Sequence, residues 1–251
     1  MDKGDIIRLD YDLFVKETGE LYETTSEERA REHDVFDEKT DYRPVVLVLE
    51  GDEVIAGLED SLMQAKVGEE YEVEIPARKA YGERDGKLVE LHSIKEILRL
   101  PEFRDGESYP EPGMKITYRN RTATIARVTA GRVRLDFTHP LAGKTLSYKY
   151  TVREKVDDPA RKVRAIVEMD YGTFDEFDQS EKDGGLVLRV PERGKYDQRW
   201  FLMKLKVVSD LRERTDYRTI TFLEEYAGKA EPVDLSGEDG SGDGNKEKGG
   251  D

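Results

Sequence analysis

The sequence predicts an α+β fold that is built mainly from antiparallel strands and a few helices. Apolar residues alternate with mostly polar ones from Ile7 to Val15, a period typical of a half-buried strand. Residues 45–49 form an apolar, mainly β-branched run that suits a strand buried on both faces. In this part of the chain, helical spacing appears within residues 54–69. One short helix among four strands indicates a helix packed on an antiparallel sheet.

Turn and helix-end signals order these first elements. The Thr-Gly pair at residues 18–19 marks a turn, after which a return strand begins. Residues 26–42 are charged and without a period, which predicts a loop. The helix is expected to run to Lys66, because Gly68 then stops it. A strand at residues 71–75 follows.

The pattern changes after residue 83. Residues 84–130 hold clustered apolar side chains, then prolines and a glycine, then short strands at residues 114–118 and 123–128. Strand patterning resumes afterwards. We therefore expect an inserted β-rich domain at residues 84–130, which splits a first domain of residues 1–83 and 131–153.

A further small α+β domain is predicted at residues 154–230. A helix begins near Pro159, and a strand covers residues 186–190. A second, more apolar helix spans residues 200–211, and a last strand lies at residues 220–222.

Composition limits the functional classes. The chain has 251 residues, a net charge of -15 and no cysteine, which excludes disulfides, thiolate metal sites and a cysteine nucleophile. Most of the negative charge lies in residues 1–83 and in the Gly-rich residues 231–251, which are expected to be disordered. An acidic protein is a poor binder of nucleic acid, because phosphate repels it. No apolar stretch approaches the roughly 20 residues of a membrane helix.

Catalytic motifs of the common enzyme classes are missing. The three histidines lack metal-ligand spacing, and the chain contains no nucleophile elbow and no phosphate-binding glycine loop. With 56 acidic residues, carboxylate pairs arise by chance, so a hydrolase with paired carboxylates has no motif support. The N-terminal segment has acids where a signal peptide needs basic and apolar residues, so a cytoplasmic protein is expected.

Three segments together resemble the FKBP family of peptidyl-prolyl isomerases. Residues 54–59 read VIAGLE, similar to the family's V-I-x-G-[WLF]-E. Residues 75–76 (IP) and 80–82 (AYG) are similar to its I-P-x-x-x-A-Y-G segment. Residues 138–146 read THPLAGKTL, which is similar to the N-H-P-L-A-G-x-x-L of SlyD-like members. The order and spacing of the three segments make the resemblance specific over about residues 1–153.

The resemblance implies an FKBP-like antiparallel sheet wrapped on a short helix, and prolyl isomerase activity. Rotation about a peptide bond crosses a barrier of about 18–20 kcal/mol, and prolyl bonds are the usual target because their two forms are close in energy. The twisted amide is less dipolar than the planar one, so an apolar pocket favours the transition state. Because no bond is broken, neither a cofactor nor a metal is expected.

The resemblance also implies a set of site residues. The Ile55 N–H is expected to donate to a substrate carbonyl, and Tyr81 matches a hydroxyl donor. Three positions depart from the family pattern. Leu58 replaces the tryptophan of small eukaryotic members, Leu47 occupies a position that is often aromatic in the family, and Glu23 stands where the family usually has aspartate. The expected site comprises Tyr11, Tyr22, Glu23, Val54, Ile55, Leu58, Tyr81, Leu141 and Tyr148.

Each assignment has a structural alternative. Val54, Ile55 and Leu58 would be core residues in almost any fold, and Tyr81 equally suits a turn cap. His139 lies in the same flap and is expected to be structural, because this reaction transfers no proton.

SlyD-like members carry an insert-in-flap chaperone domain where residues 84–130 lie in this chain. The resemblance therefore implies that the insert binds unfolded or partly folded protein clients through apolar surface. Some of its apolar residues must instead form its own core. The candidates are Ile94, Ile97, Leu98, Leu100, Phe103, Tyr109, Met114, Ile116 and Tyr118.

The C-terminal unit is similar to that of long archaeal FKBPs. It is expected to bind clients or to mediate a homodimer, and neither nucleic acid nor a membrane is an expected partner. Trp200 and Phe201 are expected in its core, with an exposed client or dimer surface as the alternative. A second hypothesis for the whole protein is a non-catalytic holdase or assembly adaptor with a degenerate pocket.

Overall fold

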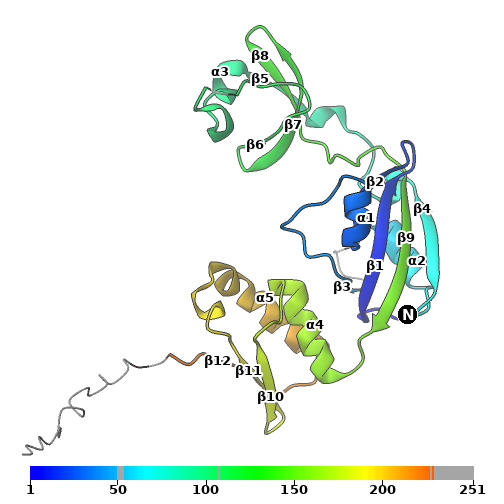
Figure 1. Ribbon diagram of the computed structural model, residues 1–251, viewed down its shortest axis with the longest axis vertical. Helices are drawn as coiled ribbons and strands as arrows, with labels where there is room; N and C mark the ends of the chain where they lie inside the picture. The colour runs from blue at the N-terminus through cyan, green and yellow to red at the C-terminus, as the bar shows by residue number, and fades with distance from the viewer. Residues whose placement is uncertain (50–53, 107, 227, 229–251) are drawn as a thin grey trace, which may run out of the picture.

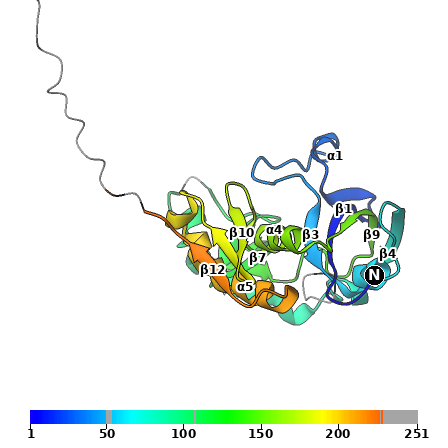
Figure 2. The same cartoon turned by 90° about the horizontal axis from the view of Figure 1, so that it is seen from below.

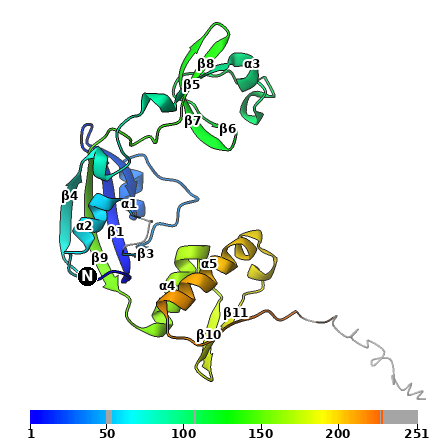
Figure 3. The same cartoon turned by 180° about the vertical axis from the view of Figure 1, so that it is seen from behind.

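The computed structural model describes residues 1–49, 54–106, 108–226 and 228, and these residues form three sheets (Figure 1). The first sheet has five strands, the second has four and the third has three. The second and third sheets lie at opposite ends of the first unit, as views from both sides show (Figures 1 and 3). The chain is therefore the mixed α+β protein that the sequence predicts.

The first sheet contains β1 (Ile6–Val15), β2 (Glu20–Thr24), β3 (Val45–Val48), β4 (Glu70–Ile75) and β9 (Leu146–Lys155). Its strands run in the order β2-β1-β9-β4, β3 also pairs with β1, and every pair is antiparallel. The alternation along β1 directs one set of its apolar side chains into the core beneath α2 (Ala56–Leu62).

Helix α2 packs closely on β4. A Cβ atom at Gly57 would lie 2.4 Å from Ile75 Cγ2, so only glycine permits this approach. The helix ends at Leu62, earlier than the expected Lys66, because the chain turns there: the amides of Gln64 and Ala65 donate to carbonyls three residues back.

Residues 26–42, expected to be a loop, contain the short helix α1 (Glu27–Glu32). The Ser26 hydroxyl caps it by accepting from the Arg29 amide at 3.4 Å, and Glu27 pairs with Arg31 at 2.7 Å. Only Ala30 is buried, so a six-residue helix of this kind has no apolar period to detect. The N-cap serine was the available signal.

The insert has a sheet of its own in the order β5-β8-β7-β6. Its elements are η2 (Gly86–Leu88), β5 (Val89–Ser93), α3 (Ile94–Ile97), η3 (Pro101–Phe103), β6 (Lys115–Tyr118), β7 (Arg121–Thr129) and β8 (Arg132–Asp136); η1 (Ala77–Lys79) precedes it. Strand β8 pairs with β5 and β7, so this sheet extends beyond residue 130. We therefore propose that the insert ends after β8.

The C-terminal unit contains α4 (Pro159–Tyr171), β10 (Asp178–Lys182), β11 (Gly185–Arg189), η4 (Gly194–Tyr196), α5 (Gln198–Arg214) and β12 (Ile220–Leu223). Its strand order is β10-β11-β12, with β11 and β12 parallel. Trp200 lies in the core, as expected. Phe201 does not: its side chain is 55% exposed, because the next helix position faces away from the sheet.

The first and third units share one core. Ile6, Val48 and Val156 pack in the same buried cluster as Val163 and Ile166 of α4. Helix α4 accordingly lies beside β3 (Figure 2). Within the described residues, no helix is long and apolar enough to cross a membrane. The expected disordered segment, residues 231–251, lies outside the described residues.

Candidate active site

A cavity of about 530 Å³ opens where β1, β3 and the start of α2 meet. The first unit contributes most of its lining, and two helices of the C-terminal unit contribute the rest. The lining residues are Leu9, Tyr11, Glu23, Val45, Val46, Leu47, Val54, Ile55, Leu58, Tyr81, Tyr148, Met169, Asp170, Met203 and Lys206.

Two tyrosines from neighbouring strands form one side of this cavity. Tyr11 on β1 and Tyr148 on β9 pack with ring centroids 5.7 Å apart. The Tyr11 hydroxyl donates to Glu23 Oε1 at 2.7 Å. Burial, and then the Glu23 carboxylate, raise the pKa of Tyr11 well above its usual range, and burial raises the pKa of Tyr148 in the same direction. Both side chains therefore stay neutral hydroxyls at physiological pH.

The start of α2 forms the floor. Ile55 is the N-cap of the helix, and its carbonyl accepts from the Leu58 and Glu59 amides at 2.9 and 3.1 Å. Within the described part of the chain, the Ile55 N–H donates to no other group. Helix N-termini leave such amides free for other acceptors. The Ile55 N–H is therefore a candidate backbone donor at a floor lined by Val54 and Leu58.

The flap carries an aromatic pair. Tyr81 and His139 stack with centroids 3.8 Å apart and planes 7° apart. The Leu141 amide donates to His139 Nδ1 at 3.2 Å, which leaves the ring proton on Nε2. Burial lowers the pKa of His139, so the ring is neutral in the folded protein at neutral pH. A hydrogen bond from the Gly143 amide to the Gly82 carbonyl, at 2.8 Å, joins the two sides of the flap.

Two of the nine sequence-predicted site residues are outside the cavity lining. Tyr22 is 39% exposed and lines an adjoining hollow, which shares Tyr11, Glu23 and Val45 with the cavity. Leu141 is fully buried in the core under the flap. The structure brings the other seven together around the cavity: Tyr11, Glu23, Val54, Ile55, Leu58, Tyr81 and Tyr148. Their individual roles stay predictions.

Sequence reasoning missed part of the lining. Leu9 and Val45 follow from strand alternation, because they share a face with Tyr11 and Leu47, whereas Val46 points to the opposite face of its strand. The four residues of α4 and α5 carried no such signal, since their place depends on how the third unit docks. In the described residues, no group of three or more histidine, aspartate or glutamate side chains is arranged to hold a metal ion.

Comparison with known proteins decides the family. A model described as FKBP-type peptidyl-prolyl cis-trans isomerase matches residues 1–95. A short-type peptidyl-prolyl cis-trans isomerase of Methanocaldococcus jannaschii is 37% identical over 152 residues, which are 61% of this chain and 92% of that protein. This chain belongs to the FKBP-type peptidyl-prolyl cis-trans isomerase family. Its enzyme class is therefore peptidyl-prolyl isomerase.

The other two units of this FKBP-type isomerase also match described domains. The FKBP26 IF domain model matches residues 97–141, and the FKBP26 C-terminal model matches residues 159–227. SlyD proteins of Helicobacter pylori and Treponema pallidum are 33% and 35% identical over 124 and 117 residues. The aligned parts are 47% and 42% of this chain, and 63% and 60% of those proteins.

Proposed function

We propose that this FKBP-type isomerase accelerates prolyl isomerisation in folding protein clients at the cavity around Ile55. The observation that carries the proposal is the free Ile55 N–H beside the apolar side chains of Val54 and Leu58, in a cavity walled by tyrosines that keep their protons. A water-poor pocket suits a transition state less polar than the planar amide. Even a 10⁶-fold acceleration needs only about 8 kcal/mol.

Each pocket group has a proposed role. The proline ring packs against Val54, Leu58 and the Tyr148 ring. The Ile55 N–H donates to a client carbonyl beside the prolyl bond and holds the chain while the bond rotates. Glu23 is a positioning residue, because it accepts the Tyr11 hydroxyl and fixes the orientation of that ring.

Replacement of Ile55 by proline tests the backbone donor. The residue has φ -64°, which proline adopts without strain, so Ile55→Pro removes the N–H and spares the backbone. Ile55→Ala is the matched control, because it loses the side chain and keeps the N–H. We expect kcat/KM for a proline tetrapeptide to be about tenfold lower in Ile55→Pro than in Ile55→Ala, the value of one hydrogen bond. Equal values would refute the donor role.

We further propose that the insert holds clients near the pocket. Its own core buries Ile97, Phe103, Ile116 and Tyr118, so these four candidates are unavailable to clients in the folded insert. The proposed client surface consists of the candidates that keep exposure, which are Ile94, Leu98, Leu100, Tyr109 and Met114. Tethering this surface to the pocket raises the local concentration of prolyl bonds there.

A double variant, Leu98→Ser with Tyr109→Ser, tests this chaperone role. We expect slower refolding of a protein limited by a prolyl step, and weaker suppression of aggregation. The tetrapeptide assay on the same sample reports whether the pocket is intact. Unchanged refolding and aggregation would contradict the assignment. A wild-type protein that suppresses aggregation but has no isomerase rate above background would instead fit the non-catalytic adaptor.

A homodimer through the C-terminal unit and a cytoplasmic location stay predictions. The apolar surface available for a dimer is the exposed side of α5, with Phe201, Leu202 and Leu205. Light scattering of the full chain and of Leu205→Glu tests the dimer: a dimeric mass that the substitution halves supports it, and a monomeric wild type refutes it.

A further inference from the structure

Part of the cavity wall comes from outside the isomerase unit. Met169 and Asp170 of α4, and Met203 and Lys206 of α5, line the same cavity as Tyr11 and Ile55. We call these four residues the helix wall. They line the cavity together with the tyrosines, so a client chain in the pocket would contact both.

Apolar packing holds the helix wall in place. Helix α4 shares one buried cluster with β1 and β3, through Ile6 and Val48 on one side and Val163 and Ile166 on the other. Because a shared core leaves no solvent layer between the units, α4 keeps a defined position relative to β3.

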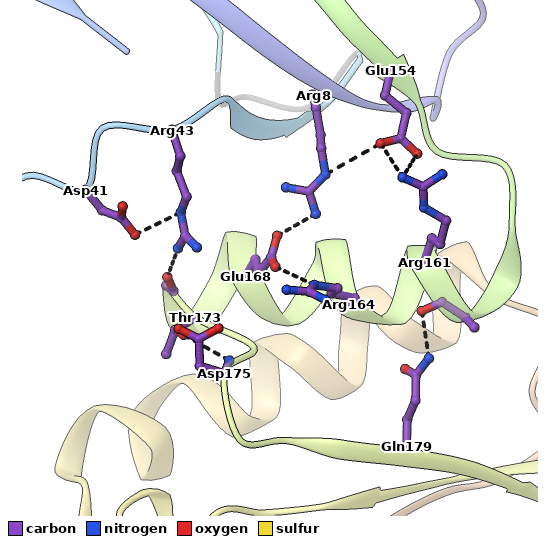
Figure 4. Close-up of polar contacts among 12 residues, drawn as sticks. Arg8, Asp41, Arg43, Glu154, Arg161, Arg164, Glu168, Thr173, Asp175 and Gln179 are labelled. Atoms are coloured by element: carbon purple, nitrogen blue, oxygen red, sulfur yellow. Dashed lines mark hydrogen bonds and ion pairs between the residues drawn. The ribbon is translucent and has the colours of Figure 1, made fainter. Parts of the chain in front are cut away.

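Ion pairs fix the same contact. Glu168 of α4 is nearly buried and accepts from Arg8 of β1 at 2.5 Å and from Arg164 at 2.9 Å (Figure 4). Arg161 pairs with Glu154 of β9 at 2.8 Å, and Arg43 donates to the Gly172 carbonyl at the end of α4. These contacts set the rotation of α4, and hence which residues it turns toward the cavity.

The chemistry of the helix wall selects apolar groups. Two thioethers offer flexible, polarisable surface that adapts to different apolar side chains. Lys206 is held at the edge by ion pairs with Asp170 and Asp210, so its charge is compensated on the protein. The Asp170 side chain is fully buried against Lys206, so an acidic client side chain would meet the Glu23 carboxylate and an ammonium that is already paired, whereas an aliphatic one would meet the methionines.

We infer that the helix wall contacts the client residue that flanks the proline and makes the enzyme selective for an apolar residue there. Met203 is the specificity-determining residue, because Met169 also packs against the shared core while Met203 reaches the cavity from α5. The C-terminal unit is thus part of the isomerase site. This inference rests on the proposed location of the isomerase pocket.

The test compares peptides that differ beside the proline. Two pairs of proline tetrapeptides carry leucine or alanine, one pair before the proline and one after it. The selectivity is the ratio of kcat/KM for leucine over alanine, measured for wild type, Met203→Glu and the control Leu202→Glu. Leu202 is a neighbour on α5 with a 73% exposed side chain outside the cavity lining.

At the peptide position that the helix wall contacts, we expect Met203→Glu to lower the leucine selectivity about three- to tenfold. This is the effect expected when the leucine side chain loses the burial of one or two methylene groups. Leu202→Glu should keep the wild-type ratio, and Met203→Leu should restore it. Selectivity equal to wild type at both positions in Met203→Glu would overturn the inference. If, in addition, Ile55→Pro and Ile55→Ala had equal kcat/KM, the assignment of the isomerase pocket itself would be wrong. If Ile55→Pro lowered kcat/KM but Met203→Glu left the leucine selectivity unchanged, only the role of the helix wall would be refuted.

Discussion

The flap shows how single residues shape the proposed pocket. His139 accepts the Leu141 amide through Nδ1 and stacks on Tyr81, an arrangement that needs a neutral ring with its proton on Nε2. The pKa of His139 is lowered because burial disfavours the charged imidazolium. The histidine therefore acts through Tyr81, which it holds at the mouth of the cavity.

The lowered pKa gives a pH prediction. A histidine whose pKa is lower in the folded state binds its proton more readily when unfolded, so its contribution to stability is present above about pH 6.5 and is lost as pH falls through the folded value. We expect wild type to lose more thermal stability than His139→Asn between pH 8 and pH 5, since asparagine keeps an acceptor without titrating. The same pH dependence in both proteins would contradict this account.

Among the helices and strands, those with a clear hydrophobic period could be predicted from the sequence, whereas short or polar ones could not. The alternation of β1 and the helical spacing of α4 each reflect burial of one face, and both appear in the structure. Helix α1 buries one residue, and β10 (DQSEK) is a polar edge strand held by its pairing with β11. Such elements depend on capping or on a neighbouring strand, which a hydrophobic pattern does not encode.

The same limit applies to the candidate site. Ile55 and Tyr81 were predicted because short motifs hold them at fixed places on one unit. Tyr22 lies beside the cavity lining and not in it: the β1–β2 pair has a register shift between Leu13 and Phe14, and Tyr22 is the β2 residue left without a partner there. Met203 was not predicted because its place depends on packing between distant parts of the chain.

Close packing of α2 on β4 gives a stability prediction. Gly57→Ala would place a Cβ 2.4 Å from Ile75 Cγ2, so overpacking should outweigh the better helix propensity of alanine. We expect a loss of about 1–3 kcal/mol in the free energy of unfolding, measured by urea denaturation. Gly86→Ala, where a Cβ meets nothing within 4 Å, should change it by about 0.5 kcal/mol or less. A Gly57 variant as stable as the Gly86 variant would mean that α2 is packed more loosely.

At the scale of the whole molecule, the three units differ in how they connect. The insert has a separate core, whereas the C-terminal unit shares its core with β1 and β3. Tight docking places α4 and α5 at the pocket, and an independent insert suits a role in holding clients. The acidity of the chain lies mainly in residues 1–83, which leaves the insert at residues 84–130 slightly basic.

The docking contact can be weakened selectively. Glu168→Ala leaves Arg8 and Arg164 without their shared, nearly buried carboxylate, and charged hydrogen bonds of this kind contribute about 1.5–3 kcal/mol. We expect a loss of that size in urea denaturation, together with lower selectivity for leucine beside the proline. Glu27→Ala, which breaks an exposed pair with Arg31, should cost about 0.5 kcal/mol or less. Equal losses in the two variants would show that Glu168 does not hold the units together.

The most direct measurement of the central claim is a crystal structure of the full chain with a proline-containing tetrapeptide bound. We predict the proline ring against Leu58 and Tyr148, a peptide carbonyl within about 3.2 Å of the Ile55 nitrogen, and the flanking side chain against Met203. A peptide bound elsewhere, or one in this cavity with no carbonyl facing Ile55, would contradict the account.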